Sequence, residues 1–457
     1  MVSTQLKHQH LLWRTGFGIA ASEIADSNNK HLEKQYDAIR AASSSSPKDI
    51  VVATNVIGNI MYDMKSAGNA PVIKKDSLSA ETKKEIQKQT RQDISKLNLT
   101  WLTEMVNSEA QLREKMSLFW HGHFASRIIN IYYQQLLLNT VRTNALGNFG
   151  DLLKAVSKSA SMLSFLNNQQ NRKQHPNENF AREVMELFTM GRGNYTEQDV
   201  KEAARAFTGW GFDKDGNFKF RPFLHDDGPK TFLGKQGNFD GDDILNIILE
   251  QKQTALFITQ KIYFNFVNET ADNNHVKWLA DRFYKSNYNI QLLMDDIFTS
   301  HWFYEEKNIG ANIKSPVELL VGIRRVLPMQ LENEVVQLLL QKALGQLLFY
   351  PPNVAGWAGG KSWIDSSTLM LRLRIPQLLK NDDTFHITTK QDDDVQMGMA
   401  ERFINVKMGK NKPVGNDAFQ MRANIDWTSF TKEFADVKKE NLYTALQSTL
   451  LQTPSSS

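Results

Sequence analysis

The chain has 457 residues, an ordinary globular balance of 41% hydrophobic and 23% charged residues, and a formal net charge of +4. This small charge, without an arginine-rich block, gives no reason to expect a nucleic-acid partner. Cysteine is absent, which excludes disulfides, thiolate catalysis and cysteine-ligated metal clusters. Neither a signal-peptide core nor a later stretch of about 18 apolar residues occurs, so the sequence predicts a cytoplasmic chain without a membrane span.

Apolar residues recur at three- and four-residue spacings through most of the chain, which indicates amphipathic helices. The clearest cases lie at 112–120, 180–188 and 256–267. Two helix starts carry their own caps. Thr196 precedes an aspartate at the third helical position, and Ser315 is followed by a proline and then by a glutamate at that position.

Residues 210–232 depart from the helical pattern. Asp215-Gly216 is a turn signal, and Phe218, Phe220 and Leu224 alternate with polar residues. This period of two favours a β-hairpin lobe at about 210–235.

The sequence therefore predicts a mainly α fold, a multi-helix globular body with a small β-hairpin lobe. Residues 1–380 are expected to form a single helical domain, followed by a loop-rich segment at 381–415. A C-terminal helical segment, 416–453, is expected to dock on the main domain. No fixed-period repeat stands out.

The first candidate for chemistry is His121-Gly122-His123. On a continuous helix, two residues two apart point in nearly opposite directions, which would place His123 inward and His121 outward. If Gly122 ends the helix, both rings can converge on one ligand. A core histidine bonded to a carbonyl is the alternative.

The second candidate runs from Asn177 to Glu186. Asn177 is a good helix cap, and Asn179, Glu183 and Glu186 fall on one flank beside an apolar stripe. A carboxylate there is costly unless it is paired or binds a metal. Ion pairs of Arg182 with glutamates four residues away are the alternative.

The third candidate is His225-Asp226 with Lys230, which we place on the return strand of the hairpin. A turn whose aspartates bond their own backbone is the alternative. The fourth is the Pro/Gly-rich loop that carries Trp357 and Trp363. These rings can stack on a sugar or another planar ligand, or simply pack the loop onto the body.

Taken in order, these segments resemble a bacterial family, the domain of unknown function 1800, over residues 10–376. The motifs that carry the resemblance are HLLWRTGFG, FWHGHFAS, NENFAREVMELFTMG with GNYTEQDV, ARAFTGW, HDDGPKTFLG, KSPVELL and PPNVAGW. The family typically has HNHF where this chain has HGHF, and often a histidine at the position of Phe188. The resemblance implies no particular activity. Many members are exported and are encoded beside sulfatase-like proteins, which implies a sulfatase-like or polysaccharide partner.

Two principal hypotheses follow. In the first, one polar pocket supports metal-assisted hydrolysis, with a divalent metal activating water beside a carboxylate base. The metal ligands would be His121, His123 and His225, and the catalytic groups Glu183, Glu186, Asp226 and Lys230. Substrate would contact Asn177, Asn179, Arg182, Trp357 and Trp363. In the second, the chain is a non-catalytic binding or accessory protein. Its polar motifs form a structural network, and the two tryptophans contact a ligand. A haem protein with His121 or His123 as axial ligand is a third hypothesis.

Overall fold

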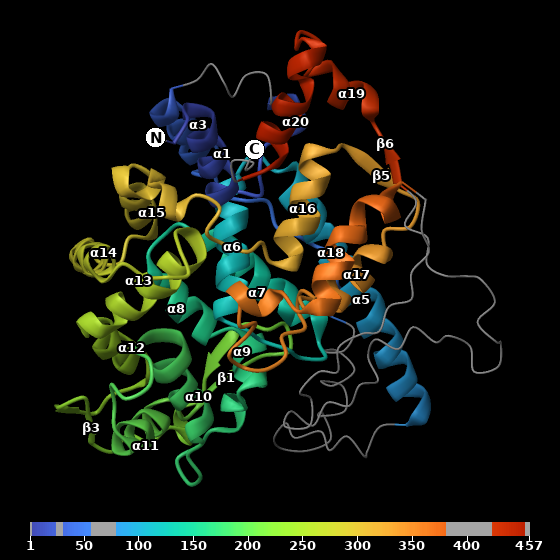
Figure 1. Cartoon of the computed structure of the whole chain (residues 1–457). Coiled ribbons are helices and arrows are strands. Elements are labelled where there is room, and N and C mark those ends of the chain that lie inside the picture. Colours follow the sequence, from blue (N-terminus) through green and yellow to red (C-terminus); the bar gives the residue numbers. More distant parts are fainter. Residues whose placement is uncertain (1, 24–30, 56–78, 381–422, 453–457) are drawn as a thin grey trace.

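A computed structural model describes residues 2–23, 31–55, 79–380 and 423–452. The fold is mainly α with small antiparallel hairpins, as predicted (Figure 1). The helices are α1 (Thr4–Thr15), α3 (Leu32–Ala42), α5 (Ala80–Asn107), α6 (Gln111–His123), α7 (Ile131–Asn144), α8 (Phe149–Ser157), α9 (Ala160–Phe165), α10 (Glu178–Glu183), α11 (Glu197–Ala206), α12 (Gly241–Leu249), α13 (Lys252–Phe266), α14 (Asn273–Lys285), α15 (Ile290–Phe298), α16 (Pro316–Val326), α17 (Val336–Leu344), α18 (Ser366–Leu379), α19 (Trp427–Lys432) and α20 (Leu442–Leu450). None of the helices described is both long and apolar enough to cross a membrane.

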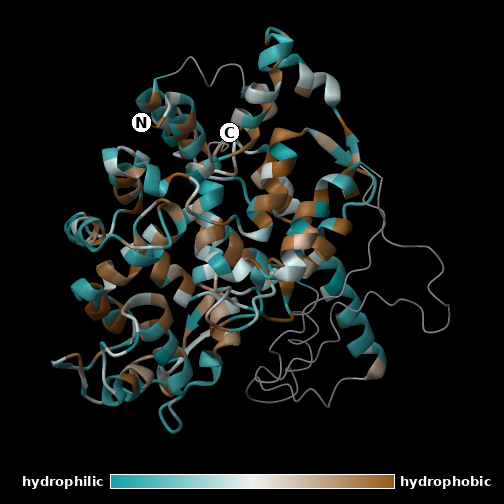
Figure 2. Ribbon diagram, in the orientation of Figure 1, coloured by the Kyte–Doolittle hydropathy of each residue, from teal (hydrophilic) through white to brown (hydrophobic). Residues whose placement is uncertain are grey.

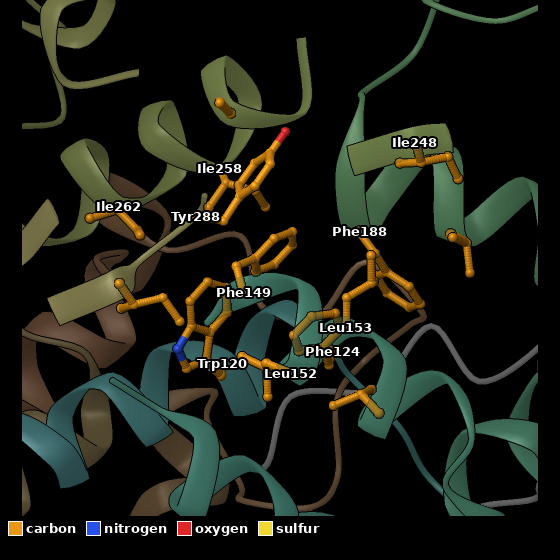
Figure 3. Packing of buried hydrophobic residues seen from close by; sticks show 14 of the residues in the cluster. Trp120, Phe124, Phe149, Leu152, Leu153, Phe188, Ile248, Ile258, Ile262 and Tyr288 are labelled. Carbon is orange, nitrogen blue, oxygen red and sulfur yellow. The ribbon is translucent and has the colours of Figure 1, made fainter. Parts of the chain in front are cut away.

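Helix α6 runs through the centre of the body and contacts α1, α3, α5 and α7. Its apolar residues are spaced to cover one face, and Trp120 from that face packs against Phe124 and Phe149. Phe188 joins this aromatic group from a distant part of the chain (Figure 3). Hydrophobic residues gather on inner helices such as α16, whereas the projecting end of α5 is hydrophilic (Figure 2). Burial of these faces supplies the main drive for folding.

The predicted helix caps are present. The Ser315 hydroxyl accepts from the amide of Glu318 at 3.3 Å, and the Glu318 carboxylate accepts from the amide of Ser315. Thr196 and Asp199 form the same reciprocal box at the start of α11. Both caps satisfy amides that the first helical turn leaves without a partner.

Two hairpins replace the single predicted one. Strands β1 (Trp210–Phe212) and β2 (Phe218–Phe220) pair antiparallel around the expected turn, which confirms the first half of the prediction. Leu224 does not continue β2, because Pro222 starts a short 3₁₀ helix instead. Strands β3 (Lys230–Phe232) and β4 (Lys235–Gly237) then form a second hairpin.

The C-terminal segment contacts the body at two places. Strand β6 (Ala423–Ile425) pairs with β5 (Met329–Leu331), and Phe430 and Phe434 bury their rings against Ile19 and Val326. The loop-rich segment predicted at 381–415 lies outside the described residues. The division of the chain into domains stays a prediction.

The helix after Asn177 differs from the regular one expected. It is α-helical to Glu183 and then widens into a π-helix, Val184–Thr189. The extra residue in the turn rotates the following side chains, so Met185 joins the buried stripe and Leu187 becomes half-buried. Insertions of this kind are frequent at functional sites.

Candidate ligand-binding pocket

His121 is buried at the end of α6, so the expectation that it faces outward is wrong. Helix α6 continues through Gly122, but α5 and the chain around Phe349 cover its other face. Nε2 of His121 accepts from the amide of Phe349 at 3.1 Å, which places the proton of the neutral ring on Nδ1. Burial lowers the pKa of His121 to about 3. The ring is therefore a neutral part of the core at physiological pH.

His123 faces inward, as predicted for a continuous helix. Its Nε2 lies 3.1 Å from the carbonyl oxygen of Phe188 in the π-helix, and this contact requires the proton on Nε2. Burial, and then the positive charge of Lys261, hold the pKa of His123 well below its usual value. Nδ1 is then a bare acceptor, and it is buried without a partner among the described residues.

The glutamates after Asn177 engage local groups. Glu186 accepts from the Tyr195 hydroxyl at 2.8 Å and pairs with Arg192, and these contacts lower the pKa of Glu186. Glu183 is half-buried, and burial followed by repulsion from Glu186 raises its pKa. Arg182 pairs on the surface with a glutamate four residues before it and with Glu197.

The side chains of the two asparagines in this segment form hydrogen bonds with backbone groups. The Asn177 side chain caps α10 by accepting from the amide of Asn179 at 3.0 Å. The Asn179 amide group donates to the carbonyl of Leu166 at 3.3 Å.

The residues of the third motif face the helical body, as expected. His225 is buried, with Nδ1 2.9 Å from the carbonyl oxygen of Thr208. Asp226 receives both a 2.8 Å and a 3.1 Å hydrogen bond from Arg205 of α11. Lys230 donates to the carbonyls of Asp226 and Gly228. These contacts fix the hairpins against α11.

The structure does not bring the three motifs into one pocket. One ring nitrogen of each histidine bonds to a backbone group. The carboxylates of Glu186 and Asp226 bond to a tyrosine or to arginines nearby. Within the described part of the chain, no group of three or more His, Asp or Glu side chains is arranged to hold a metal ion.

A pocket of about 400 Å³ does form where α1, α6, α13 and the chain before α16 meet the loop after α17. Among the predicted site residues, it is lined by His123, Trp357 and Trp363. Its size suits a small-molecule ligand. Trp13, Phe257 and Phe264 add further aromatic surface, so much of the wall is flat and apolar.

Four basic side chains line this pocket: Arg14, Lys115, Lys261 and Lys314. Only two acidic ones, Glu269 and Glu318, accompany them. Lys115 forms an ion pair with Glu318. Burial alone would raise the pKa of Glu318, but Lys115 beside it lowers the value overall. That pair neutralises itself.

The other three cations have no carboxylate within ion-pair distance among the residues described. Arg14 is buried and donates from Nη2 to the carbonyl of Asn308 at 3.3 Å. Nζ of Lys261 lies over the Phe257 ring, and Nζ of Lys314 lies 3.3 Å from the centre of the Trp13 ring system. Burial lowers the pKa of Arg14 to about 10 and that of Lys261 to about 8, so both are largely charged at pH 7.

Three polar atoms in the pocket wall are buried without a hydrogen-bond partner in the described part of the chain. They are Nδ1 of His123, Oε1 of Glu269 and Oδ1 of Asn312. All three are acceptors. An unsatisfied buried acceptor is costly unless a ligand or water completes it.

The tryptophan loop is held by a close backbone contact. Gly356 has φ +79°, and a Cβ there would lie 2.3 Å from the carbonyl oxygen of Gly122. Trp357 follows it directly and its ring lies 5.7 Å from that of His121. The contact seats this loop on the end of α6 and so places one wall of the pocket.

Sequence reasoning missed the pocket's cations, although a signal for two of them was present. Arg14 lies in HLLWRTGFG, and Lys314 opens KSPVELL. Lys115 and Lys261 each interrupt an apolar helical face, which is where a buried charge can be suspected.

The family model described as protein of unknown function (DUF1800) matches residues 10–456. The chain therefore belongs to that family, which confirms the resemblance. Comparison with curated proteins and comparison with solved structures gave no match.

Proposed function

We propose that this protein binds a small organic anion that has a flat or apolar ring, such as an aromatic carboxylate or an acidic monosaccharide. The observation that carries the proposal is the excess of cations over carboxylates in a pocket with aromatic walls. Among the described residues that line the pocket, Arg14, Lys261 and Lys314 are accompanied by one carboxylate that is in no ion pair, Glu269. Buried charges normally have partners, because leaving water costs several kcal/mol each. An anionic ligand would supply the missing charge.

The pocket offers both kinds of contact that such a ligand needs. Arg14 presents a guanidinium fork suited to a carboxylate, sulfate or phosphate group. Trp357 and Trp363 offer ring faces, and the unpartnered acceptors can receive hydroxyl donors of the ligand. An acidic sugar of a polysaccharide satisfies this chemistry, and the proposed role is that of the binding or accessory protein. A sulfatase-like partner stays a prediction. Metal-assisted hydrolysis also stays a prediction, and no cluster of three or more metal-binding side chains among the described residues supports it.

Matched pairs of compounds test this proposal. Benzoate and glucuronate are expected to raise the melting temperature of the full chain, whereas benzyl alcohol and glucose are not, because only the anions offset the cation excess. Arg14→Gln should weaken benzoate binding at least tenfold, since a charged hydrogen-bond pair contributes about 1.5–3 kcal/mol. Affinity should fall as the pH rises from about 6 to 9, because Lys314, with a pKa of about 7, and then Lys261, with a pKa of about 8, lose their protons.

The control is Arg282→Gln, which removes an exposed arginine that is paired with Asp296 and does not line the pocket. This variant should bind benzoate as the wild type does. Equal stabilisation by anionic and neutral compounds, or unchanged binding in Arg14→Gln, would refute the proposal.

A further inference from the structure

Lys314 has an unusual position in this pocket. It directly precedes Ser315, the cap of α16, and its Nζ lies against the Trp13 ring with no ion-pair partner among the described residues. Glu318 is the nearest carboxylate in the same segment, but it already holds the Lys115 ammonium and the amide of Ser315. The Lys314 amine is therefore left without an acid of its own.

The charged groups around Lys314 come from four elements. Lys115 of α6, Arg14 of α1 and Lys261 of α13 share its pocket, and Arg372 of α18 donates to its carbonyl oxygen at 2.9 Å. The opposing carboxylates are Glu318 and Glu269. Burial lowers the pKa of Lys314 to about 7; Glu318 opposes this shift, and Lys115 and Arg372 add to it. In a large fraction of the molecules, the Lys314 side chain is then an uncharged amine at neutral pH, and it lies against the Trp13 ring.

We propose that Lys314 is a nucleophile that forms an imine with a small carbonyl compound bearing a carboxylate, such as a 2-oxo acid. This inference rests on the proposed function, because Arg14 would hold the carboxylate of the same ligand. A lysine desolvated beside other cations is a recognised arrangement for such chemistry. The pocket has room for the compound and an amine in its wall.

The reaction balances without an oxidant or reductant. The Nζ lone pair attacks the carbonyl carbon, a C–N bond forms, and the carbonyl oxygen takes up a proton as nitrogen loses one. The carbinolamine then expels its hydroxyl group as water, and the nitrogen lone pair completes the C=N bond. We assign the proton transfers, to the carbonyl oxygen and then to the leaving hydroxyl group, to Glu269, which lines the same pocket and has one oxygen without a partner among the described residues.

Reductive trapping tests the inference. The full chain is incubated with pyruvate and sodium cyanoborohydride, digested, and its modified lysines are identified by mass spectrometry. Lys314 is expected to be modified at least tenfold faster than surface lysines, with half of the maximal rate near pH 7. Lys314→Arg should abolish this modification, whereas Lys158→Arg, at a surface pair with Asp242, should leave it unchanged.

A binding measurement separates this inference from the proposed function. Lys314→Arg keeps a positive charge and should still bind pyruvate by calorimetry. If wild-type protein binds pyruvate but Lys314 is modified no faster than surface lysines, the imine proposal fails alone. If pyruvate, benzoate and glucuronate all fail to bind, the anion pocket fails as well.

Discussion

Glu114→Gln is expected to lower the free energy of unfolding by about 3–5 kcal/mol, because it breaks a buried ion pair from one side only. Glu114 and Arg142 each expose 1% of their side chains, and the carboxylate receives Nη2 of Arg142 at 2.7 Å. It also accepts from the indole of Trp101 at 2.9 Å. Glutamine keeps the shape but leaves the buried guanidinium with only the exposed carboxylate of Glu104 as an ion-pair partner.

A surface pair provides the comparison. Glu197→Gln removes one of the two carboxylates that pair with Arg182, and this carboxylate is 70% exposed. Such pairs contribute little, since water and salt screen them. Chemical denaturation of the three proteins should therefore show a large loss for Glu114→Gln and almost none for Glu197→Gln. Equal losses would show that the buried pair does not stabilise the body as described.

Gly356→Ala should also destabilise the protein, by about 2–5 kcal/mol, and should weaken ligand binding. An alanine at position 356 would be strained at φ +79°, which costs about 1–2 kcal/mol. Its Cβ would also meet the carbonyl oxygen of Gly122 at 2.3 Å, and relief of such a clash costs about 1–3 kcal/mol more. Movement of the loop would displace Trp357 from the pocket wall.

Gly193→Ala separates the two effects. Gly193 has φ +84°, and nothing lies within 4 Å of a Cβ built there. Gly193→Ala should therefore lower the free energy of unfolding only by the cost of the backbone strain, and should leave benzoate binding unchanged. If the two alanine variants lose the same stability and bind benzoate equally, the close contact does not position the loop.

Local features of this fold could be predicted from the sequence. The caps at Thr196 and Ser315 need only residues three positions apart, and the β1–β2 turn needs only Asp215-Gly216 between two alternating runs. Their physical causes lie within a few residues of one another. Pro222 ended the second strand early, a signal that was present in the sequence but outweighed by the apolar alternation.

The candidate site was less predictable, because its parts meet only in the folded chain. His121 was expected to face outward, and only the packing of Trp101 and Phe349 against α6 buries it. Glu186 bonds to Tyr195 and Asp226 bonds to Arg205. These contacts stabilise both carboxylates without a shared metal. Trp357 and Trp363 line the pocket, and their role as ligand contacts stays a prediction.

The excess of cations in the pocket could not be predicted from patterns in the sequence. Arg14 and Lys314 are 300 positions apart in the sequence, and whether a charge is buried or paired depends on packing between those segments. A net charge of +4 spread over the chain gives no sign that unpaired cations concentrate in one pocket.

The most direct test of the anion pocket is the calorimetric affinity of wild type and Glu269→Gln for benzoate. Glu269 is the acidic side chain of the pocket wall without an ion pair among the described residues, so its removal makes the pocket more positive. Anion affinity should rise several-fold, on the order of 1 kcal/mol for a charge at this range in a partly screened site. Weaker benzoate binding by Glu269→Gln, or binding of a divalent metal by wild type that this substitution abolishes, would contradict the account.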